Sequence, residues 1–179
     1  MKKFSPSSTV LAAALSFSPA LLHAEPSAPA KPSAPAIEEK TEGEKKVMEE
    51  KKADFEITVT CNDAMQFDKK EIKVPLGKLI KLTLKNVGKA PKIAMGHNLV
   101  ILNKGASLQP WAMKAMSARD SEFVPSDEES MKAVLAHTKL LGPDEEDAVT
   151  FTLTEAGEYE FLCSFPGHFS LMRGKLIAK

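Results

Sequence analysis

Residues 159–174 read YEFLCSFPGHFSLMRG. An apolar strand pattern leads into Cys163, the dipeptide Pro166-Gly167 signals a turn, and His168 and Met172 follow. Four and then three residues separate the cysteine, the histidine and the methionine. Side chains at this spacing can meet at one point only if the chain leaves a strand and doubles back. The segment therefore predicts a strand, a tight loop and a returning strand.

The side chains on this loop are metal-binding groups. A histidine far upstream, His97 in MGHN, can complete the set. One thiolate and two imidazoles, with a thioether at long range, suit copper in both the Cu(I) and the Cu(II) state. We therefore predict one copper ion held by His97, Cys163, His168 and Met172. Such a site would exchange single electrons with little rearrangement and do no other chemistry.

Three other interpretations remain open for these residues. A single cysteine near a strand end is commonly a buried apolar side chain. A structural zinc site normally has four strong nitrogen or sulfur donors, and a methionine is a poor fourth donor. A Cys-His nucleophile pair needs a third group that orients the base, and the sequence has no clear Asn or Asp for that role. The occurrence of all four residues together favours copper.

The N-terminus has the pattern of an export signal. Lys2 and Lys3 precede an apolar stretch, and Leu22-His23-Ala24 ends it, so residues 1–24 are predicted to be a cleavable signal peptide. The stretch is broken by serines and Pro19, and it is shorter than the ~20 apolar residues that a spanning helix needs. We expect a periplasmic protein with no membrane span.

Residues 25–53 differ in composition from the C-terminal part of the chain. Prolines at 26, 29, 32 and 35 recur every third residue, and the rest is mostly charged. This composition predicts a semi-rigid and then disordered linker, which could act as a tether or as a simple spacer. Without Lys2 and Lys3, 22 of the 24 basic residues remain against 24 acidic ones. A balance this close to neutral does not indicate a nucleic-acid partner.

Residues 54–179 show the alternation of β-strands. Alternating or apolar runs between turn signals predict strands near 55–59, 72–74, 79–84, 98–102, 149–153, 159–162 and 174–178. This predicts one all-β domain, a β-sandwich. A helical stripe over residues 108–116, and a capping pattern that begins at Ser126, predict a short helical insert packed against it.

Several motifs in this domain belong together: CNDAMQF (61–67), MGHN (95–98), AHTKLLG (136–142), VTF (149–151) and the ligand loop CSFPGHFSLMRG (163–174). With this set, residues 54–179 resemble the azurin family of small bacterial cupredoxins. The resemblance implies a Greek-key β-sandwich or barrel. It implies His97, Cys163 and His168 as equatorial copper ligands and Met172 as the axial ligand. It also implies a weak opposite contact from the backbone carbonyl of Gly96.

The resemblance extends to the surroundings of the site. It implies that Asn98 ties the two ligand loops together and that the backbone amides of Asn98 and Phe165 hydrogen-bond the cysteine sulfur. It implies an exposed apolar patch, matched here by Met65, Met95, Phe165 and Pro166, with the electron leaving through the edge of His168. Phe169 is unusually large for its position, and we hypothesise that it enlarges this patch.

Some positions depart from the family pattern. The usual disulfide far from copper has no counterpart, because Phe55 and Lys78 stand at its two positions. Cys61 is predicted to be a free and inert thiol. Asn86 replaces a buried histidine that makes the potential depend on pH in the family, so that dependence should be weak here. His137 is expected near the surface and not as a ligand.

The resemblance implies a monomeric electron carrier, not an enzyme, that docks transiently with periplasmic redox proteins. Cytochrome-type donors and reductase or oxidase acceptors are the expected partners. A copper oxidase or nitrite reductase would need a multi-histidine cluster, and the chain has four histidines in all. A copper carrier or storage protein would be expected to have Met-rich or His-rich tracts, whereas the eight methionines are mostly dispersed.

Overall fold

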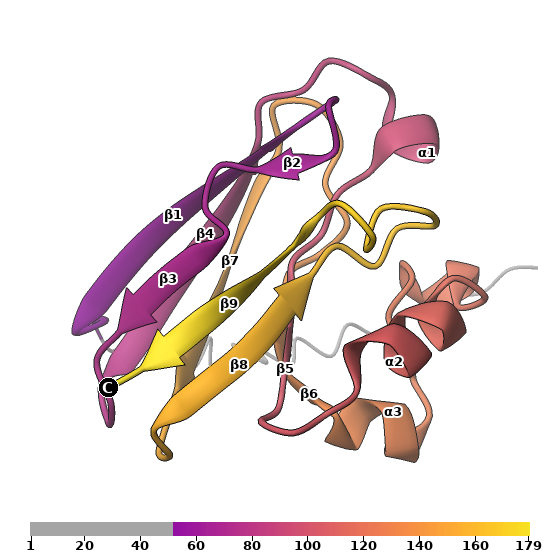
Figure 1. Ribbon diagram of the computed structural model, residues 1–179. Helices are drawn as coiled ribbons and strands as arrows, with labels where there is room; N and C mark the ends of the chain where they lie inside the picture. The colour runs from indigo at the N-terminus through magenta and orange to yellow at the C-terminus, as the bar shows by residue number, and fades with distance from the viewer. Residues whose placement is uncertain (1–51) are drawn as a thin grey trace, which may run out of the picture. The chain divides into compact units, whose positions relative to one another are not determined.

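The computed structural model describes residues 52–179, and Figure 1 shows them as two β-sheets beside a small group of helices. The predicted signal peptide, residues 1–24, and nearly all of the predicted linker, residues 25–53, lie outside the described residues. Among the helices that are described, none is long and apolar enough to cross a membrane.

The strands form a mixed sandwich. One sheet has the order β2-β1-β4-β7 and the other the order β3-β9-β8-β5-β6. Their bounds are β1 (Phe55–Asn62), β2 (Gln66–Phe67), β3 (Glu71–Val74), β4 (Leu79–Asn86), β5 (Val100–Leu102), β6 (Val134–His137), β7 (Glu146–Thr152), β8 (Gly157–Leu162) and β9 (Arg173–Ala178). β1 is parallel to β4, and β3 is parallel to β9, whereas the other pairs are antiparallel. The predicted Greek-key β-sandwich is confirmed.

Sequence alternation decides which face of each strand enters the core. In β4, Ile80, Leu82 and Leu84 are completely buried, while the residues between them are partly exposed. In β1, Val59 and Cys61 face the same core. Successive side chains of a strand point to opposite faces, so this period of two gives the sheet one apolar face. Burial of such side chains contributes about 1.5–3 kcal/mol each.

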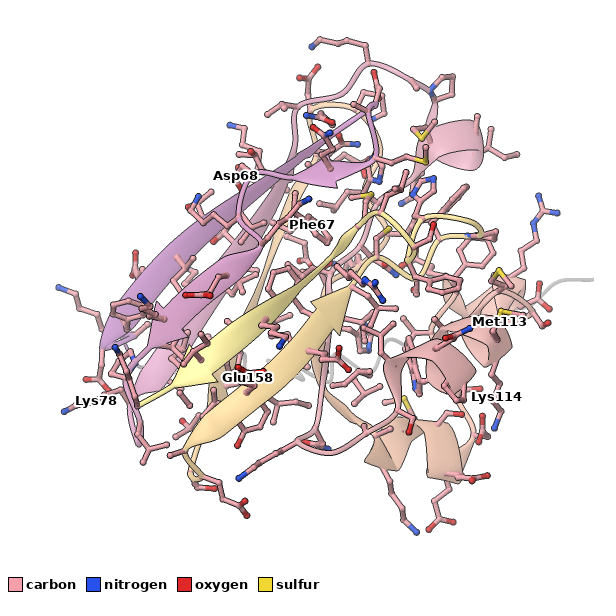
Figure 2. The ribbon with its side chains drawn as sticks, in the orientation of Figure 1. Phe67, Asp68, Lys78, Met113, Lys114 and Glu158 are labelled. Carbon is pink, nitrogen blue, oxygen red and sulfur yellow. The ribbon has the colours of Figure 1, made fainter. Side chains whose placement is uncertain are left out.

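The helical insert lies between β5 and β6. It contains α2 (Leu108–Ala115), the short helix η1 (Arg119–Ser121) and α3 (Glu128–Lys132). The predicted stripe of α2 is buried, and the indole Nε1 of Trp111 donates a hydrogen bond to the Ser130 carbonyl oxygen at 3.0 Å. Asp127 caps α3 by accepting from the Ser130 N–H. Met113 and Lys114 project from α2 to the exterior, as Figure 2 shows.

The insert packs on the outer face of the five-stranded sheet. Val100 and Leu102 of β5 belong to the apolar cluster under α2, whereas Ile101 between them belongs to the sandwich core. At the end of β8, Leu162 belongs to the cluster under α2, and Phe161 belongs to the sandwich core. This part of the sheet is therefore buried on both faces. The interpretation of the helical stripe as core is confirmed.

Four short elements were not predicted from the sequence: β2, β6, η1 and α1 (Lys92–Met95). In β6 the first three residues are uniformly half-buried rather than alternating. β6 exists because it pairs with β5. Elements this short carry too few residues for a periodic pattern, so tertiary pairing determines them.

Candidate metal centre

Three buried side chains converge at one end of the sandwich. The ligand atoms of His97, Cys163 and His168 all lie within 4.8 Å of one another. The Cys163 Sγ is 3.6 Å from Nδ1 of His168 and 4.0 Å from Nδ1 of His97. Figure 1 shows that the loop between β8 and β9, which carries Cys163 and His168, lies at the end opposite the C-terminus.

Backbone hydrogen bonds close the ligand loop as predicted. The His168 N–H donates to the Phe165 carbonyl at 3.0 Å, and the Met172 N–H donates to the His168 carbonyl at 2.8 Å. The Cys163 N–H then donates to the Met172 carbonyl at 2.9 Å. Gly167 takes φ +84°, a left-handed conformation that glycine adopts without strain. The loop thus brings the Met172 backbone back beside Cys163, and the Met172 side chain is fully buried in the core that also contains Cys163.

His97 comes from a different part of the chain and is held by a backbone bridge. Its N–H donates to the Leu141 carbonyl at 3.1 Å, and the Leu141 N–H donates to the His97 carbonyl at 2.7 Å. Gly96, just before it, is so tightly enclosed that an added Cβ would lie 2.7 Å from the Lys92 carbonyl oxygen and 3.0 Å from the Leu140 side chain. Close packing at Gly96, rather than an unusual φ, excludes any other residue there.

Asn98 joins the two ligand loops, as the resemblance implied. Its Nδ2 donates to Ser164 Oγ at 2.8 Å, and its Oδ1 accepts from the Ser164 N–H at 2.8 Å. All these groups are buried. Because Asn98 adjoins His97 and Ser164 adjoins Cys163, this pair of bonds sets the separation between one imidazole and the sulfur.

Burial dominates the electrostatics of the three ligand candidates. It raises the pKa of Cys163 to about 12, although hydrogen bonds from the backbone amides of Asn98 and Phe165 act to lower that pKa. Burial and then the neighbouring His97 lower the pKa of His168 to about 4. Burial also lowers the pKa of His97, against the opposing charge of Asp63. At neutral pH both imidazoles are therefore uncharged, and metal binding must release the thiol proton.

The donor set fits copper. Nε2 of His97 is buried without a hydrogen-bond partner among the described residues, and its Nδ1 faces the cysteine sulfur. The Nδ1 atoms of both His97 and His168 face the cysteine sulfur, so the three donor atoms are directed to one buried point where a metal ion would bind. A soft thiolate with two neutral imidazoles is the donor set of blue-copper sites. Within residues 52–179 the cluster has no fourth histidine, cysteine or carboxylate of the kind that structural zinc requires.

Among the described residues, the remaining cysteine and histidine, Cys61 and His137, lie outside this cluster. Cys61 and Cys163 are both free thiols, so no disulfide joins them. Burial raises the pKa of Cys61 to about 12, which leaves little reactive thiolate and agrees with an inert role. His137 is exposed, and its Nδ1 lies 3.2 Å from the Thr138 carbonyl oxygen. The predicted free state of Cys61 and the predicted surface position of His137 are confirmed.

The surface beside the ligands differs from the prediction in two respects. His168 is only 3% exposed, so the predicted exposed edge is small, and the Phe165 ring packs against it with centroids 4.7 Å apart. Phe169 does not simply enlarge the apolar patch. It is partly buried against the apolar cluster of the helical insert, because the loop runs alongside that insert.

Sequence reasoning also missed an apolar groove of about 660 Å³ next to the patch. Phe165 and Pro166 form one side of it, and Ile93, which is 78% exposed, lies at another. Phe123 of the insert also lines the groove. Its residues are scattered from α1 to the ligand loop, so no local pattern could have indicated it.

A buried cysteine between two imidazoles, at one end of a Greek-key sandwich, defines the cupredoxin class of small copper proteins. A family model described as copper binding proteins of the plastocyanin/azurin family matches residues 53–179. Azurin-2 of Alcaligenes xylosoxydans xylosoxydans is 46% identical over 129 residues, which cover 69% of this chain and 97% of that protein. Outer membrane protein H.8 of Neisseria meningitidis is 43% identical over 122 residues, which cover 66% and 64% of the two chains.

Solved structures agree with these relatives. The azurin iso-2 of Methylomonas sp. strain J has a TM-score of 0.61 and 33% identity, covering 71% of this chain and 99% of that one. Reduced auracyanin of Roseiflexus castenholzii has the same TM-score and identity, covering 69% and 96%. The chain belongs to the plastocyanin/azurin family of copper-binding proteins. At this level it is a copper protein of the electron-transfer type.

Proposed function

We propose that this protein is an exported type 1 copper protein that shuttles single electrons between redox partners. In this proposal His97, Cys163 and His168 are the equatorial ligands, Met172 is the axial ligand, and the carbonyl of Gly96 is a weak contact on the opposite side. The observation that carries the proposal is the position of the Cys163 sulfur, 3.6 and 4.0 Å from the two Nδ1 atoms in a buried site.

The residues around the sulfur fit a rapid one-electron carrier. Bound copper would supply the chemistry by alternating between Cu(II) and Cu(I). Backbone amides of Asn98 and Phe165 donate to the sulfur and stabilise its negative charge. The Asn98–Ser164 bonds and the loop hydrogen bonds hold the ligands in place before the metal binds. A site held in this way needs little rearrangement when its charge changes.

Electrons would enter and leave near the 3% of His168 that is exposed. The surrounding surface includes Met65, Met95, Phe165 and Pro166, each of which is partly buried. A partly buried apolar surface suits weak, short-lived docking of a monomer. The expected partners are cytochrome-type donors and reductase or oxidase acceptors.

The proposed location of the protein rests on its N-terminal sequence. Residues 1–24 would direct export to the periplasm and be removed, residues 25–53 would act as a linker, and residues 54–179 would form the copper domain. The name of the Neisseria relative places that protein in the outer membrane, which supports a cell-envelope location here.

The test is a titration of the purified, metal-free protein with Cu(II), followed by visible spectroscopy. We expect an intense blue thiolate-to-copper band that a one-electron reductant bleaches reversibly. The matched control is Cys163→Ser, which removes the thiolate and should show no such band. Copper binding without colour in the unsubstituted chain would instead favour a copper carrier.

The axial role is tested separately by Met172→Leu, which keeps the side-chain volume and removes the sulfur. We expect copper to remain bound and the reduction potential to rise, because a weak axial donor is lost. Voltammetry of both proteins measures the shift. Loss of copper from the variant would show that Met172 is a principal ligand, which contradicts the assignment.

A further inference from the structure

Two consecutive residues of the helical insert, Glu122 and Phe123, adopt left-handed backbone conformations. Their φ angles are 53° and 63°. Such conformations are uncommon for residues other than glycine, asparagine and aspartate, and they persist when surrounding contacts enforce them. Strained backbone of this kind clusters at functional sites. The contacts made by these two side chains show what the strained conformation achieves.

Phe123 begins a chain of three rings that ends at a ligand. Its side chain is 9% exposed, and its ring meets Phe165 edge to face, with centroids 5.1 Å apart at 70°. Phe165 in turn packs on His168 with centroids 4.7 Å apart. The turn at Gly167 leaves His168 on a short, sharply bent loop. The Phe123 ring therefore supports the imidazole from outside that loop.

Glu122 makes contacts toward the other two ligands. Its carbonyl oxygen accepts from Asn98 Nδ2 at 3.3 Å, and Asn98 is the residue that joins the His97 and Cys163 loops. Its carboxylate Oε2 accepts from the Leu140 N–H at 3.0 Å, and Oε1 lies 3.6 Å from Lys92 Nζ. Leu140 and Lys92 are the two residues that enclose Gly96.

We propose that Glu122 and Phe123 form a clasp by which the helical insert positions the metal ligands. Phe123 is the positioning residue for His168, acting through Phe165. Glu122 is the positioning residue for His97, acting through Leu140 and Asn98. The left-handed conformation of both residues lets one short segment direct a ring toward the ligand loop and a carboxylate toward Leu140. This inference rests on the proposed metal centre.

The competing explanation is that Phe123 only fills space in the wall of the groove. A side chain that only fills space can be replaced by another apolar side chain without effect on the ligands. A ring that orients a second ring cannot be replaced in this way. The substitution Phe123→Leu keeps an apolar side chain and removes the ring. The separate substitution Phe123→Tyr keeps the aromatic ring. Met116→Ala is the matched control, because it removes apolar surface from the same groove and leaves all three rings in the chain.

The experiment uses the full chain and has two readouts. The first is the NMR signal of the His168 imidazole in the metal-free protein, and the second is the affinity for Cu(I) in competition with a chelator. For Phe123→Leu we expect a broadened or doubled imidazole signal and an affinity lower by about twofold to tenfold, the range that an aromatic pair is worth. Phe123→Tyr and Met116→Ala should resemble the unsubstituted protein.

Glu122→Ala gives a second, independent test. It removes the acceptor of the Leu140 N–H and should disturb the His97 imidazole signal more than that of His168. Melting curves and the fluorescence of Trp111, which is buried in the insert, report whether each variant has folded. If Phe123→Leu does not fold, the His97 signal of Glu122→Ala alone tests the proposed clasp.

Failure of the clasp and failure of the metal centre give different results. Unchanged imidazole signals in both Phe123→Leu and Glu122→Ala would overturn the clasp, even if copper binds normally. Equal effects of Phe123→Leu and Met116→Ala would show a filler and would also overturn it. Absence of the blue band in the unsubstituted protein would overturn the metal centre, and the signals of the metal-free protein would still test the clasp.

Discussion

The two ends of the sandwich are stabilised by different interactions. At the ligand end, buried side chains hydrogen-bond to distant backbone: Asn98 joins Ser164, and Asn86 Nδ2 donates to the Gly142 carbonyl at 2.9 Å. At the opposite end, where Figure 1 shows the C-terminus and Figure 2 shows Lys78, main-chain pairing continues. There the Leu76 N–H donates to the Lys179 carbonyl, and the Lys179 N–H donates to the Val74 carbonyl, both at 3.2 Å.

The interactions at the ligand end fix the positions of side chains, whereas those at the far end contribute mainly to the stability of the fold. A buried polar pair is satisfied by one geometry and is costly when broken. Strand pairing and apolar contact tolerate small displacements. The far end has no disulfide, and Phe55 packs there against the sandwich core. We infer that the ligand end holds the metal donors in one arrangement and tolerates little displacement, whereas the far end stabilises the fold.

The largest expected effect is at the ligand end. Asn98→Ala would leave the N–H and hydroxyl of Ser164 buried without their partner. We expect a loss of about 2–4 kcal/mol in the free energy of unfolding, measured by urea denaturation of the metal-free protein. The control is Asn103→Ala, which removes a more exposed hydrogen bond to the Lys132 carbonyl. Equal losses in the two variants would remove the distinction between the buried and exposed contacts.

The second prediction concerns pH and the metal-free protein. The pKa of His168 is lowered in the folded state to about 4, so the unfolded chain binds a proton more readily. The stability contributed by the neutral imidazole is therefore complete above pH 6.5 and is lost as the pH falls toward 4. Melting temperatures measured across this range should fall with pH, and less steeply for His168→Asn. A pH-independent melting temperature would contradict the burial argument.

A smaller effect is expected at the far end. Phe55→Ala removes a half-buried ring from the start of β1, and we expect a loss of roughly 1–2 kcal/mol, below the cost of emptying a full core site. The blue band of the copper-loaded variant should be unchanged, because strand pairing at the far end does not set the ligand geometry. A shifted band would mean that the two ends are coupled, and the comparison would fail.

The smallest effect is expected from pH on the reduction potential. Asn86 is buried and bonded on both sides, donating to Gly142 and accepting from the Gly88 N–H at 2.9 Å, and its amide does not titrate. We expect the potential to change little between about pH 6 and 8, the range in which an ordinary histidine titrates. Asn86→His should introduce a pH dependence, as voltammetry would show. A strong dependence in the unsubstituted protein would place the titrating group elsewhere.

Local sequence was enough to predict the ligand set and most strands. The spacing of Cys163, His168 and Met172 requires a hairpin-like loop, and the turn residues for it are adjacent in the chain. Alternation in β4 and the stripe of α2 are likewise local, because the period of an element is a property of its own backbone. The resemblance supported the far ligand, His97, which no local pattern connects to the loop.

Other features could not be predicted in this way. Nothing in the sequence around Glu122 and Phe123 indicates a left-handed backbone, since those conformations are enforced by Leu140, Asn98 and Phe165. The near-complete burial of His168 and the partial burial of Phe169 depend on how close the helical insert lies to the loop. β6 has no pattern of its own and is defined by pairing with β5.

The sequence by itself therefore determined which donors are present, that they suit copper, and that a β-sandwich carries them. These conclusions rest on residue chemistry and on periodicities of two and 3.6, which need no knowledge of distant contacts. Only the tertiary structure decided how the donors are held and how much of His168 reaches the surface. Orientation and exposure are set by side chains from remote segments, and chain folding alone brings those segments together.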